Sequence, residues 1–264
     1  MKATVFLGGG RITSALLAGL QLARYDRPIV VHDRHPRKLR QVKREYGVTV
    51  EPDLHRAVKM ARVLIIAVRP DSVRELLQQV GPVSRRLTAV SLTAGVPLAQ
   101  LRDGLGPPVQ WARAMPSPVS RSGSGLTALT FGPGLSIAVR ANLRKLFALV
   151  GPVVEIPENQ FDAFTVTYSS SHGLHALATL VDAAEAIGLD RKTARLAAAH
   201  ALADGIVAWR AGNLPLKQLL REAATPGGIA ATVMASLDDA GYAEIVARGL
   251  RAGIARARQM SRRS

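Results

Sequence analysis

Hydrophobic positions follow two different patterns in the two parts of the chain. Up to about residue 157, short apolar runs alternate with longer segments of helical period. The runs are residues 4–7, 29–32, 63–68, 87–92, 109–112 and 126–131. Strands that alternate with helices are typical of βαβ units. The pattern therefore predicts an α/β domain over residues 1–157, built as a Rossmann-like, doubly wound and mostly parallel sheet.

From residue 158 to residue 264 the pattern is helical throughout and rich in Ala and Leu. Glycine and proline interrupt it at residues 188–190, 212–215, 225–228 and 241, where helices are expected to stop and start. Three segments (176–187, 194–208 and 229–237) are apolar on most sides, too broadly for one small bundle to bury easily. We expect an all-α dimerisation domain and hence a homodimer, with a compact monomeric bundle as the alternative.

A glycine turn follows the first apolar run and leads directly into a helical segment. Gly8 and Gly10 match the first two glycines of the dinucleotide-binding fingerprint, whereas Thr13 stands where its third Gly or Ala is expected. Such a turn lets the first backbone N–H groups of a helix approach a pyrophosphate. The backbone of Gly8, Gly10, Arg11 and Ile12 is therefore predicted to bind a dinucleotide.

The second predicted strand ends at Asp33, where folds of this kind contact the adenosine ribose. A carboxylate there favours the free 2′-hydroxyl of NADH, whereas Arg34 and Arg37 favour the 2′-phosphate of NADPH. The two arginines and the positive charge of the chain favour NADPH, and NADH stays possible.

Composition and charge narrow the function classes. The chain of 264 residues has no cysteine, which excludes thiolate catalysis and cysteine-ligated zinc, and no metal site is predicted. Neither a targeting segment nor an apolar run long enough to span a membrane is recognised, so a cytoplasmic protein without a membrane partner is expected. The net charge of +16 is spread over many arginines with few interleaved aromatic residues. A solvated basic surface is favoured over a nucleic-acid partner.

Blocks at residues 8–12, 33–39, 67–70, 91–96, 113–118 and 225–228 resemble, in order and spacing over nearly the whole chain, those of the pyrroline-5-carboxylate reductase family. Its second-strand motif is similar to residues 33–39. Its Ala-Val-Lys-Pro motif is similar to residues 67–70, and its Ser-Ile-Ala-Ala-Gly-Val motif to residues 91–96. Its Arg-x-Met-Pro-Asn-Thr-Pro block resembles residues 113–118, one residue shorter, and its late Pro-Gly-Gly turn resembles residues 225–228. The resemblance implies hydride transfer from a reduced nicotinamide to the C=N carbon of a cyclic imine, which yields proline. It also implies further cofactor contacts, at Ala67, Val68, Pro70, Thr93, Ala94, Met115 and Pro116.

The segments that resemble the family's substrate site depart from its pattern. The resemblance implies a threonine hydroxyl facing the imine after the Pro-Gly-Gly turn, but Ala230 occupies that position. The family's Ser-Gly-Ser-Gly-Pro segment is replaced by residues 169–173, and the Met-Pro block has lost its Asn-Thr pair, leaving Ser117 in its place. We expect the substrate to contact Ser117, Ser169, Ser171, Thr225, Gly227, Gly228 and Ala230.

Proton delivery is assigned to the segment that replaces the family's glycines. His172 has a side chain whose ordinary pKa suits proton transfer, Tyr168 offers a hydroxyl, and Ser170 lies between them. This segment has a structural alternative, since its serines could simply cap the following helix. Because of these departures, two alternatives to proline synthesis stay open. One is reduction of a related cyclic imine, and the other is a non-catalytic dimer that binds the cofactor.

Overall fold

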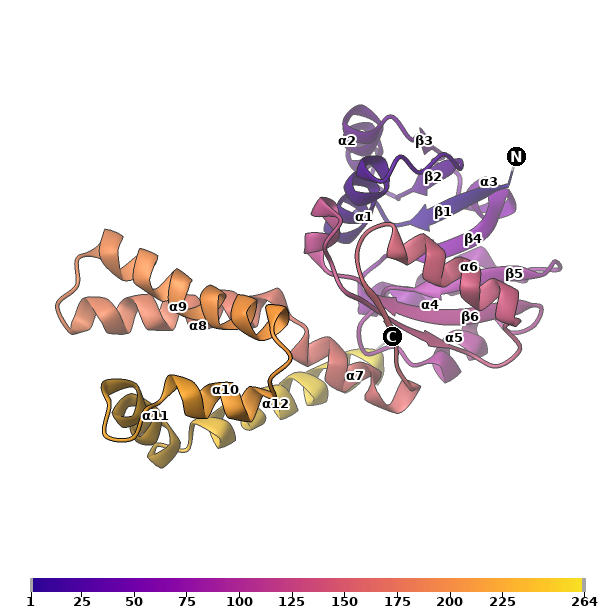
Figure 1. Ribbon diagram of the computed structural model, residues 1–264. Coiled ribbons are helices and arrows are strands. Elements are labelled where there is room, and N and C mark those ends of the chain that lie inside the picture. The colour runs from indigo at the N-terminus through magenta and orange to yellow at the C-terminus, as the bar shows by residue number, and fades with distance from the viewer. Residues whose placement is uncertain (1, 263–264) are drawn as a thin grey trace. The chain divides into compact units, whose positions relative to one another are not determined.

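The computed structural model describes residues 2–262, which form two units (Figure 1). Unit 1 comprises residues 2–166 together with residues 253–262, and unit 2 comprises residues 167–252. Unit 1 contains the sheet, and unit 2 consists of helices. The helical part of the chain therefore contributes elements to both units.

A single sheet of order β3-β2-β1-β4-β5-β6-β7-β8 runs through unit 1. Its strands are β1 (Ala3–Leu7), β2 (Ile29–His32), β3 (Thr49–Val50), β4 (Ala61–Ile66), β5 (Leu87–Ser91), β6 (Val109–Met115), β7 (Thr127–Phe131) and β8 (Val153–Glu155). All neighbouring pairs are parallel except β6 and β7. The predicted doubly wound sheet is confirmed, and each predicted apolar run contains most or all of one strand.

Helices cover both faces of the sheet. Along each central strand, successive apolar side chains point to opposite faces, and both sets are buried. Val5, Leu64 and Ala89 face α3 (Leu54–Met60), α4 (Val73–Val80) and α5 (Leu98–Gly104). Phe6, Ile65 and Val90 face α1 (Arg11–Leu22), α2 (Pro36–Tyr46) and α6 (Ile137–Ala148). Two short 3₁₀ helices, η1 (Pro70–Ser72) and η2 (Pro118–Ser122), lie in the connections. A sheet buried on both faces needs apolar residues at nearly every strand position, which is why these strands read as continuous apolar runs.

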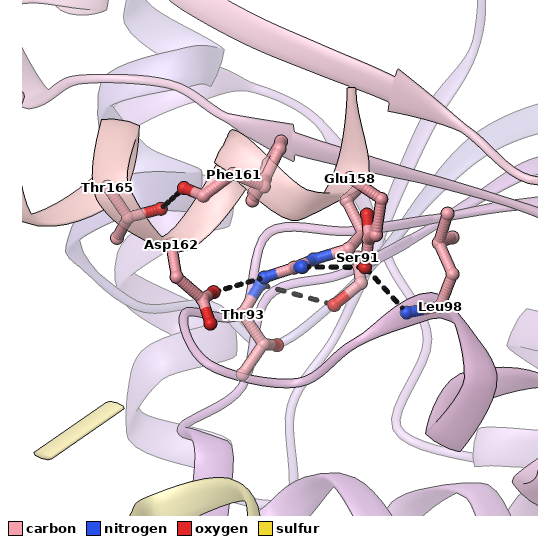
Figure 2. A network of polar contacts seen from close by, with 8 residues as sticks. Ser91, Thr93, Leu98, Glu158, Phe161, Asp162 and Thr165 are labelled. Atoms are coloured by element: carbon pink, nitrogen blue, oxygen red, sulfur yellow. Dashed lines mark hydrogen bonds and ion pairs between the residues drawn. The ribbon is translucent and has the colours of Figure 1, made fainter. Parts of the chain in front are cut away.

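Helix α7 (Glu158–Thr167) is tied to the sheet by a buried arginine (Figure 2). Arg113 on β6 is 1% exposed, and its guanidinium contacts Glu158 at 2.9 Å and Asp162 at 3.4 Å. The ring of Phe161 lies 4.1 Å from the same guanidinium. Glu158 Oε1 also accepts a hydrogen bond of 2.9 Å from the backbone N–H of Leu98 at the start of α5. One carboxylate therefore joins a strand to two helices.

Unit 1 is completed by the C-terminal part of α12 (Tyr242–Arg262). Gly95, in the turn between β5 and α5, has a φ of +73° and lies so close to the backbone of Ala257 that a Cβ would collide with its carbonyl. A Cβ at Gly253 would lie 3.1 Å from a side-chain methyl of Val166 near the end of α7, a tight contact without a backbone collision. The collision and the positive φ explain why glycine occupies position 95.

Unit 2 contains α8 (Ser170–Ala186), α9 (Arg191–Ala211), α10 (Leu216–Ala223), α11 (Ile229–Asp239) and the first part of α12. Asp190 begins α9 as an N-cap, accepting hydrogen bonds from the N–H groups of Lys192 and Thr193. The buried apolar core between α8 and α9 is small, comprising Val181, Ala194 and Ala198. Most of the large apolar side chains of this unit are therefore exposed in the single chain.

Candidate active site

The turn between β1 and α1 has the geometry of a phosphate-binding loop. Gly8 has a φ of +112°, and a Cβ at this position would lie 2.5 Å from the carbonyl oxygen of Ala67 on the neighbouring strand connection. Gly10 is the N-cap of α1 without any side-chain cap, and the space around its missing Cβ is open within 4 Å. The first N–H groups of a helix lack intrahelical partners. The start of α1 therefore presents free donors to the space beside Gly10.

Thr13 has a structural role that explains its departure from the glycine fingerprint. Its side chain is completely buried, and its hydroxyl donates a hydrogen bond of 2.5 Å to the carbonyl of Gly8. A Gly or Ala at this place would allow close packing but would leave that carbonyl without this donor. Thr13 therefore fixes the turn from inside the first helical turn.

Asp33, at the end of β2, also holds the glycine turn in place. Its Oδ2 accepts a hydrogen bond of 2.8 Å from the N–H of Gly9, and its Oδ1 accepts one of 2.8 Å from the N–H of His35. The ammonium of Lys38 lies 3.4 Å from Oδ2. Burial raises the pKa of Asp33, but these backbone donors and the Lys38 charge together lower the pKa below its ordinary value. Asp33 is thus an ionised carboxylate engaged by the protein itself.

A cavity of about 420 Å³ lies at the carboxyl ends of β1, β2 and β4, where the order of the strands reverses. Ligands of open α/β sheets bind at such switch points. Among its lining residues are three cationic side chains, Arg34, Lys38 and Arg69, beside the glycine turn. Glu75 and Gln79 from α4 line it as well. Free helix N–H groups, glycine backbone and cations together fit a pyrophosphate-containing dinucleotide.

Six of the predicted cofactor residues line this cavity: Gly8, Gly10, Asp33, Arg34, Ala67 and Val68. The other eight do not: Arg11, Ile12, Arg37, Pro70, Thr93, Ala94, Met115 and Pro116. Sequence reasoning missed His35, Lys38 and Arg69, which do line it. Lys38 lies in the first turn of α2, which follows β2, and Arg69 lies within the Ala-Val-Arg-Pro block. Both could have been found as cations adjoining predicted strand ends.

Two of the predicted residues outside the cavity are buried polar side chains. Thr93 is 2% exposed, and its Oγ1 has no hydrogen-bond partner among the described residues. Ser117 is the N-cap of η2 and accepts a hydrogen bond of 3.2 Å from the N–H of Val119. The predicted substrate contact of Ser117 therefore coexists with a local capping role.

The predicted catalytic segment lies at the junction of α7 and α8, within unit 2. Tyr168 is half-buried in the turn, whereas Ser170 and His172 are exposed in the first turn of α8. Ser169 is the N-cap of α8 by position, but its side chain makes no capping hydrogen bond. Its hydroxyl instead lies 2.6 Å from that of Ser171. Ser169 thus does not use its side chain to cap the helix.

The late glycine turn of unit 2 forms the start of α11. Gly227 has a φ of +77°, Gly228 is the N-cap, and its N–H donates to the carbonyl of Thr225. Ala230 is exposed in the first turn and adds only a methyl group. The hydroxyl of Thr232, two residues further on, donates a hydrogen bond of 3.2 Å to the carbonyl of Gly228. Ala230, predicted above to stand in place of a threonine, therefore offers no hydroxyl.

Membrane-spanning helices and metal-binding clusters were the remaining possibilities for residues 2–262. No helix within residues 2–262 is long and apolar enough to cross a membrane. The same residues contain no group of three or more His, Asp or Glu side chains arranged to hold a metal ion.

Comparison with known proteins gives matches over both parts of the chain. Residues 4–95 match the family described as NADP oxidoreductase coenzyme F420-dependent, and residues 158–260 match the family described as pyrroline-5-carboxylate reductase dimerisation. A pyrroline-5-carboxylate reductase of Thermus thermophilus is 33% identical over 84% of this chain and 85% of its own length. One of Synechocystis is 28% identical over 97% of both chains.

A solved structure extends the comparison to the fold. The pyrroline carboxylate reductase of Plasmodium falciparum, solved with NADP bound, has a TM-score of 0.85 to this chain. It is 18% identical in sequence, and the match covers 98% of each chain. At this identity the likeness shows the fold alone.

The sheet order, the glycine turn and the switch-point cavity define the class, that of doubly wound dinucleotide-binding proteins. Within that class, the identity to the Thermus thermophilus protein over most of both chains decides the family. This chain belongs to the pyrroline-5-carboxylate reductase family.

Proposed function

We propose that this protein is an NAD(P)H-dependent reductase of a cyclic imine, with pyrroline-5-carboxylate as the first candidate substrate and L-proline as its product. Family membership over both parts of the chain, together with the phosphate-binding turn, carries the proposal. A bound reduced nicotinamide supplies the hydride that converts the C=N carbon to a C–H carbon. The protein must bind the cofactor, orient the imine and provide a proton for its nitrogen.

The cofactor preference that we propose is NADPH. Each oxygen of Asp33 already accepts one backbone hydrogen bond, and Lys38 lies beside Oδ2, so fewer of its acceptor sites are left for a ribose hydroxyl. Arg34, Lys38 and Arg69 line the same cavity and can bind the 2′-phosphate. Lys38 also partly neutralises Asp33, which reduces repulsion of that phosphate.

For the substrate we propose a carboxylate site at the start of α11 and the start of α8. The unpaired N–H groups at a helix start bind carboxylates without a side chain, which would compensate for the missing hydroxyl at Ala230. The hydroxyls of Ser169 and Ser171 are exposed or half-buried and can donate further hydrogen bonds. Tyr168 and His172 are then the candidates for protonating or orienting the imine nitrogen.

The absent hydroxyl supports a second candidate, reduction of a related cyclic imine. The deciding experiment follows NADPH and NADH oxidation by the parent chain with five- and six-membered cyclic imino acids. A preference for the five-membered acid supports the proline reaction, and a preference for another ring supports the second candidate. Binding of NADPH without turnover of any imine would contradict both and leave a non-catalytic dimer.

The same assay tests the residues. Ala230→Thr is compared with Ala230→Val, which has the same shape without the hydroxyl. A gain with pyrroline-5-carboxylate that only the threonine variant shows identifies the hydroxyl as the missing element. His172→Ala and Tyr168→Phe are each expected to lower kcat by about 10²–10⁴-fold if the residue donates the proton. An unchanged kcat in both variants assigns the segment a structural role.

A further inference from the structure

A second, larger cavity lies at the amino ends of the parallel strands, opposite to the cofactor cavity. It has a volume of about 840 Å³. Six cationic side chains line it (Lys2, Arg24, Arg27, Arg62, Arg86 and Lys145), against one carboxylate, Asp26. The cofactor cavity, by comparison, is lined by three Lys or Arg side chains and by two carboxylates. The second cavity is therefore the more strongly basic of the two.

The sheet topology brings four of these cations side by side. Arg27 precedes β2, Lys2 precedes β1, Arg62 lies near the start of β4, and Arg86 precedes β5. These strands are neighbours in the order β2-β1-β4-β5. Because neighbouring strands lie about 4.8 Å apart, the four cations form a row across the amino-terminal ends of these strands.

A backbone irregularity places Arg62 in this row. The register between β1 and β4 pairs Ala3 with Ala61 and then Thr4 with Val63, so that Arg62 is the extra residue of a bulge. A bulge changes the direction of the side chain that it inserts. Without the bulge, the side chain at this position would follow the regular alternation of the strand between the two faces of the sheet.

A second irregularity concerns Arg24, at the end of α1. Its φ of +52° makes it the one residue other than glycine with a positive φ among residues 2–262. The N–H groups of Arg24 and Tyr25 close the helix onto the carbonyls of Gln21 and Leu20, a geometry in which glycine usually takes the left-handed position. The chain thus keeps an arginine at a place where its backbone is unfavourable.

The six cations are also unpaired within the described part of the chain, where no carboxylate oxygen lies within 4.0 Å of their charged nitrogens. Like charges held side by side repel each other. The cavity wall between them includes the apolar side chains of Val63 and Leu146 and the ring of Tyr25, whose hydroxyl is held by Thr4 Oγ1 at 3.1 Å. An anionic ligand would relieve the repulsion.

We propose that this cavity is a binding site for a linear polyphosphate, separate from the cofactor site. A row of cations at strand spacing matches phosphates joined in series, and guanidinium groups bind phosphate oxygens with two parallel hydrogen bonds. Both a nucleoside triphosphate and inorganic polyphosphate carry this chemistry. The site is built from unit 1 alone and does not depend on the reductase function.

The test is isothermal titration calorimetry on the full chain, first saturated with NADPH so that the cofactor cavity is closed to phosphates. Sodium tripolyphosphate, ATP and long-chain polyphosphate are titrated separately in a magnesium-free buffer. Saturable binding of tripolyphosphate that weakens as salt is added is expected. Tighter binding of ATP than of tripolyphosphate identifies a nucleoside triphosphate, and equal or weaker binding of ATP identifies inorganic polyphosphate.

Three variants locate the binding. Arg62→Gln/Arg86→Gln should weaken tripolyphosphate binding by about tenfold or more, since each arginine makes charged hydrogen bonds. The matched control is Arg102→Gln/Arg195→Gln, which removes the same charge from exposed positions outside the cavity. Arg24→Gly tests the site in another way. It removes a cation, and it places glycine at a positive φ that is unfavourable for arginine. It should raise the melting temperature and weaken binding.

The proposal is overturned if the parent shows no saturable binding, or if the control pair weakens binding as much as the cavity pair. An unchanged affinity for tripolyphosphate in Arg24→Gly would show that Arg24 and its unusual backbone conformation do not belong to the site. Unchanged NADPH affinity in every variant confirms that folding and the cofactor cavity are intact.

Discussion

Asp33 occupies the position at which dinucleotide-binding folds place the ribose-binding acid. Its carboxylate, however, contacts other groups of the protein. The sequence located this carboxylate at the end of a strand, but it could not supply the rotamer that turns both oxygens toward the N–H groups of Gly9 and His35. Competition between a ribose and a backbone donor is decided by distances of a few tenths of an ångström. Such distances depend on the whole turn and cannot be deduced from residue spacing.

A pH-dependent stability follows from the depressed pKa of Asp33. Since the folded pKa lies below the unfolded value of about 3.9, the ionised carboxylate stabilises the fold above that pH. This contribution is lost as pH falls through the folded pKa. Asp33→Asn keeps only one acceptor and should lower stability near neutral pH by about 1–2 kcal/mol. Urea unfolding of parent and variant should therefore differ most near pH 7 and converge in acid, and a constant difference would contradict this account.

Substitutions at the two predicted glycines of the turn should have different effects. Gly8→Ala meets a backbone oxygen and an unfavourable φ, so it should destabilise the fold by roughly 2 kcal/mol or more. Gly10→Val meets open space and an ordinary φ, so the fold should survive while the side chain fills the phosphate position. Thermal unfolding and NADPH titration separate the two effects. NADPH binding by Gly10→Val as tight as that of the parent would exclude the turn as the phosphate site.

The cations near the ribose position provide a matched pair. Lys38 lines the cavity, whereas Arg37, its neighbour on α2, does not. Lys38→Ala should raise the KM for NADPH several-fold and leave the KM for NADH nearly unchanged, because only NADPH carries the 2′-phosphate. Arg37→Ala serves as the control for loss of charge. The sequence predicted Arg37 as a contact, and a larger effect in Arg37→Ala than in Lys38→Ala would favour that assignment.

At the scale of elements, the strands that the sequence predicted are those buried on both faces. Residues 63–68 are apolar at every position and residues 87–92 at all but Thr88 and Ser91, because helices cover the sheet on either side. The two strands that were not predicted have weaker signals. Thr49–Val50 is only two residues long, and Val153–Glu155 is a partly exposed edge strand. Long-range pairing supplies their structure, and the local pattern does not.

The link between β6 and α7 likewise depends on long-range contacts that the local sequence pattern does not reveal. Arg113 is a charge inside an apolar strand, which by itself indicates a buried ion pair. Its partners, Glu158 and Asp162, lie 45 and 49 residues further along, and their spacing of four on a helix is common on solvent-exposed faces. Sequence reasoning therefore ended the sheet domain at residue 157 without this link in view.

Removing the junction carboxylate should loosen this link. Glu158→Ala deprives the buried guanidinium of its nearer partner and the N–H of Leu98 of its acceptor. Because Asp162 stays in place and Glu158 is partly exposed, we expect a loss of about 2 kcal/mol, less than for a fully buried pair. Chemical denaturation measures it. Glu155→Ala, which removes a carboxylate from a surface ion pair with Arg144, is the control and should cost less than 1 kcal/mol.

At the scale of the whole molecule, the helical unit exposes more apolar surface than a stable single chain would be expected to carry. Leu196, Ile206 and Val207 on α9 and Val233 on α11 are each more than half exposed. The buried core between α8 and α9, by contrast, consists mainly of small side chains. Exposed patches of this kind mark interaction surfaces. The family's dimerisation match over residues 158–260 supports a second copy of the chain as the partner.

The resulting prediction is a homodimer whose stability depends on protein concentration. Light scattering at micromolar concentration should report about twice the chain mass of 28.1 kDa. The melting temperature should rise with concentration, because association stabilises the folded chain by mass action. Ile206→Asp places a charge on the exposed face of α9 and should yield monomer with a lower melting temperature. Ile137→Asp changes an equally apolar and more exposed residue of the sheet unit, and it should leave both mass and melting temperature unchanged. A monomeric parent would contradict the predicted homodimer. A dimer that Ile206→Asp leaves intact, with both variants losing stability equally, would place the interface elsewhere.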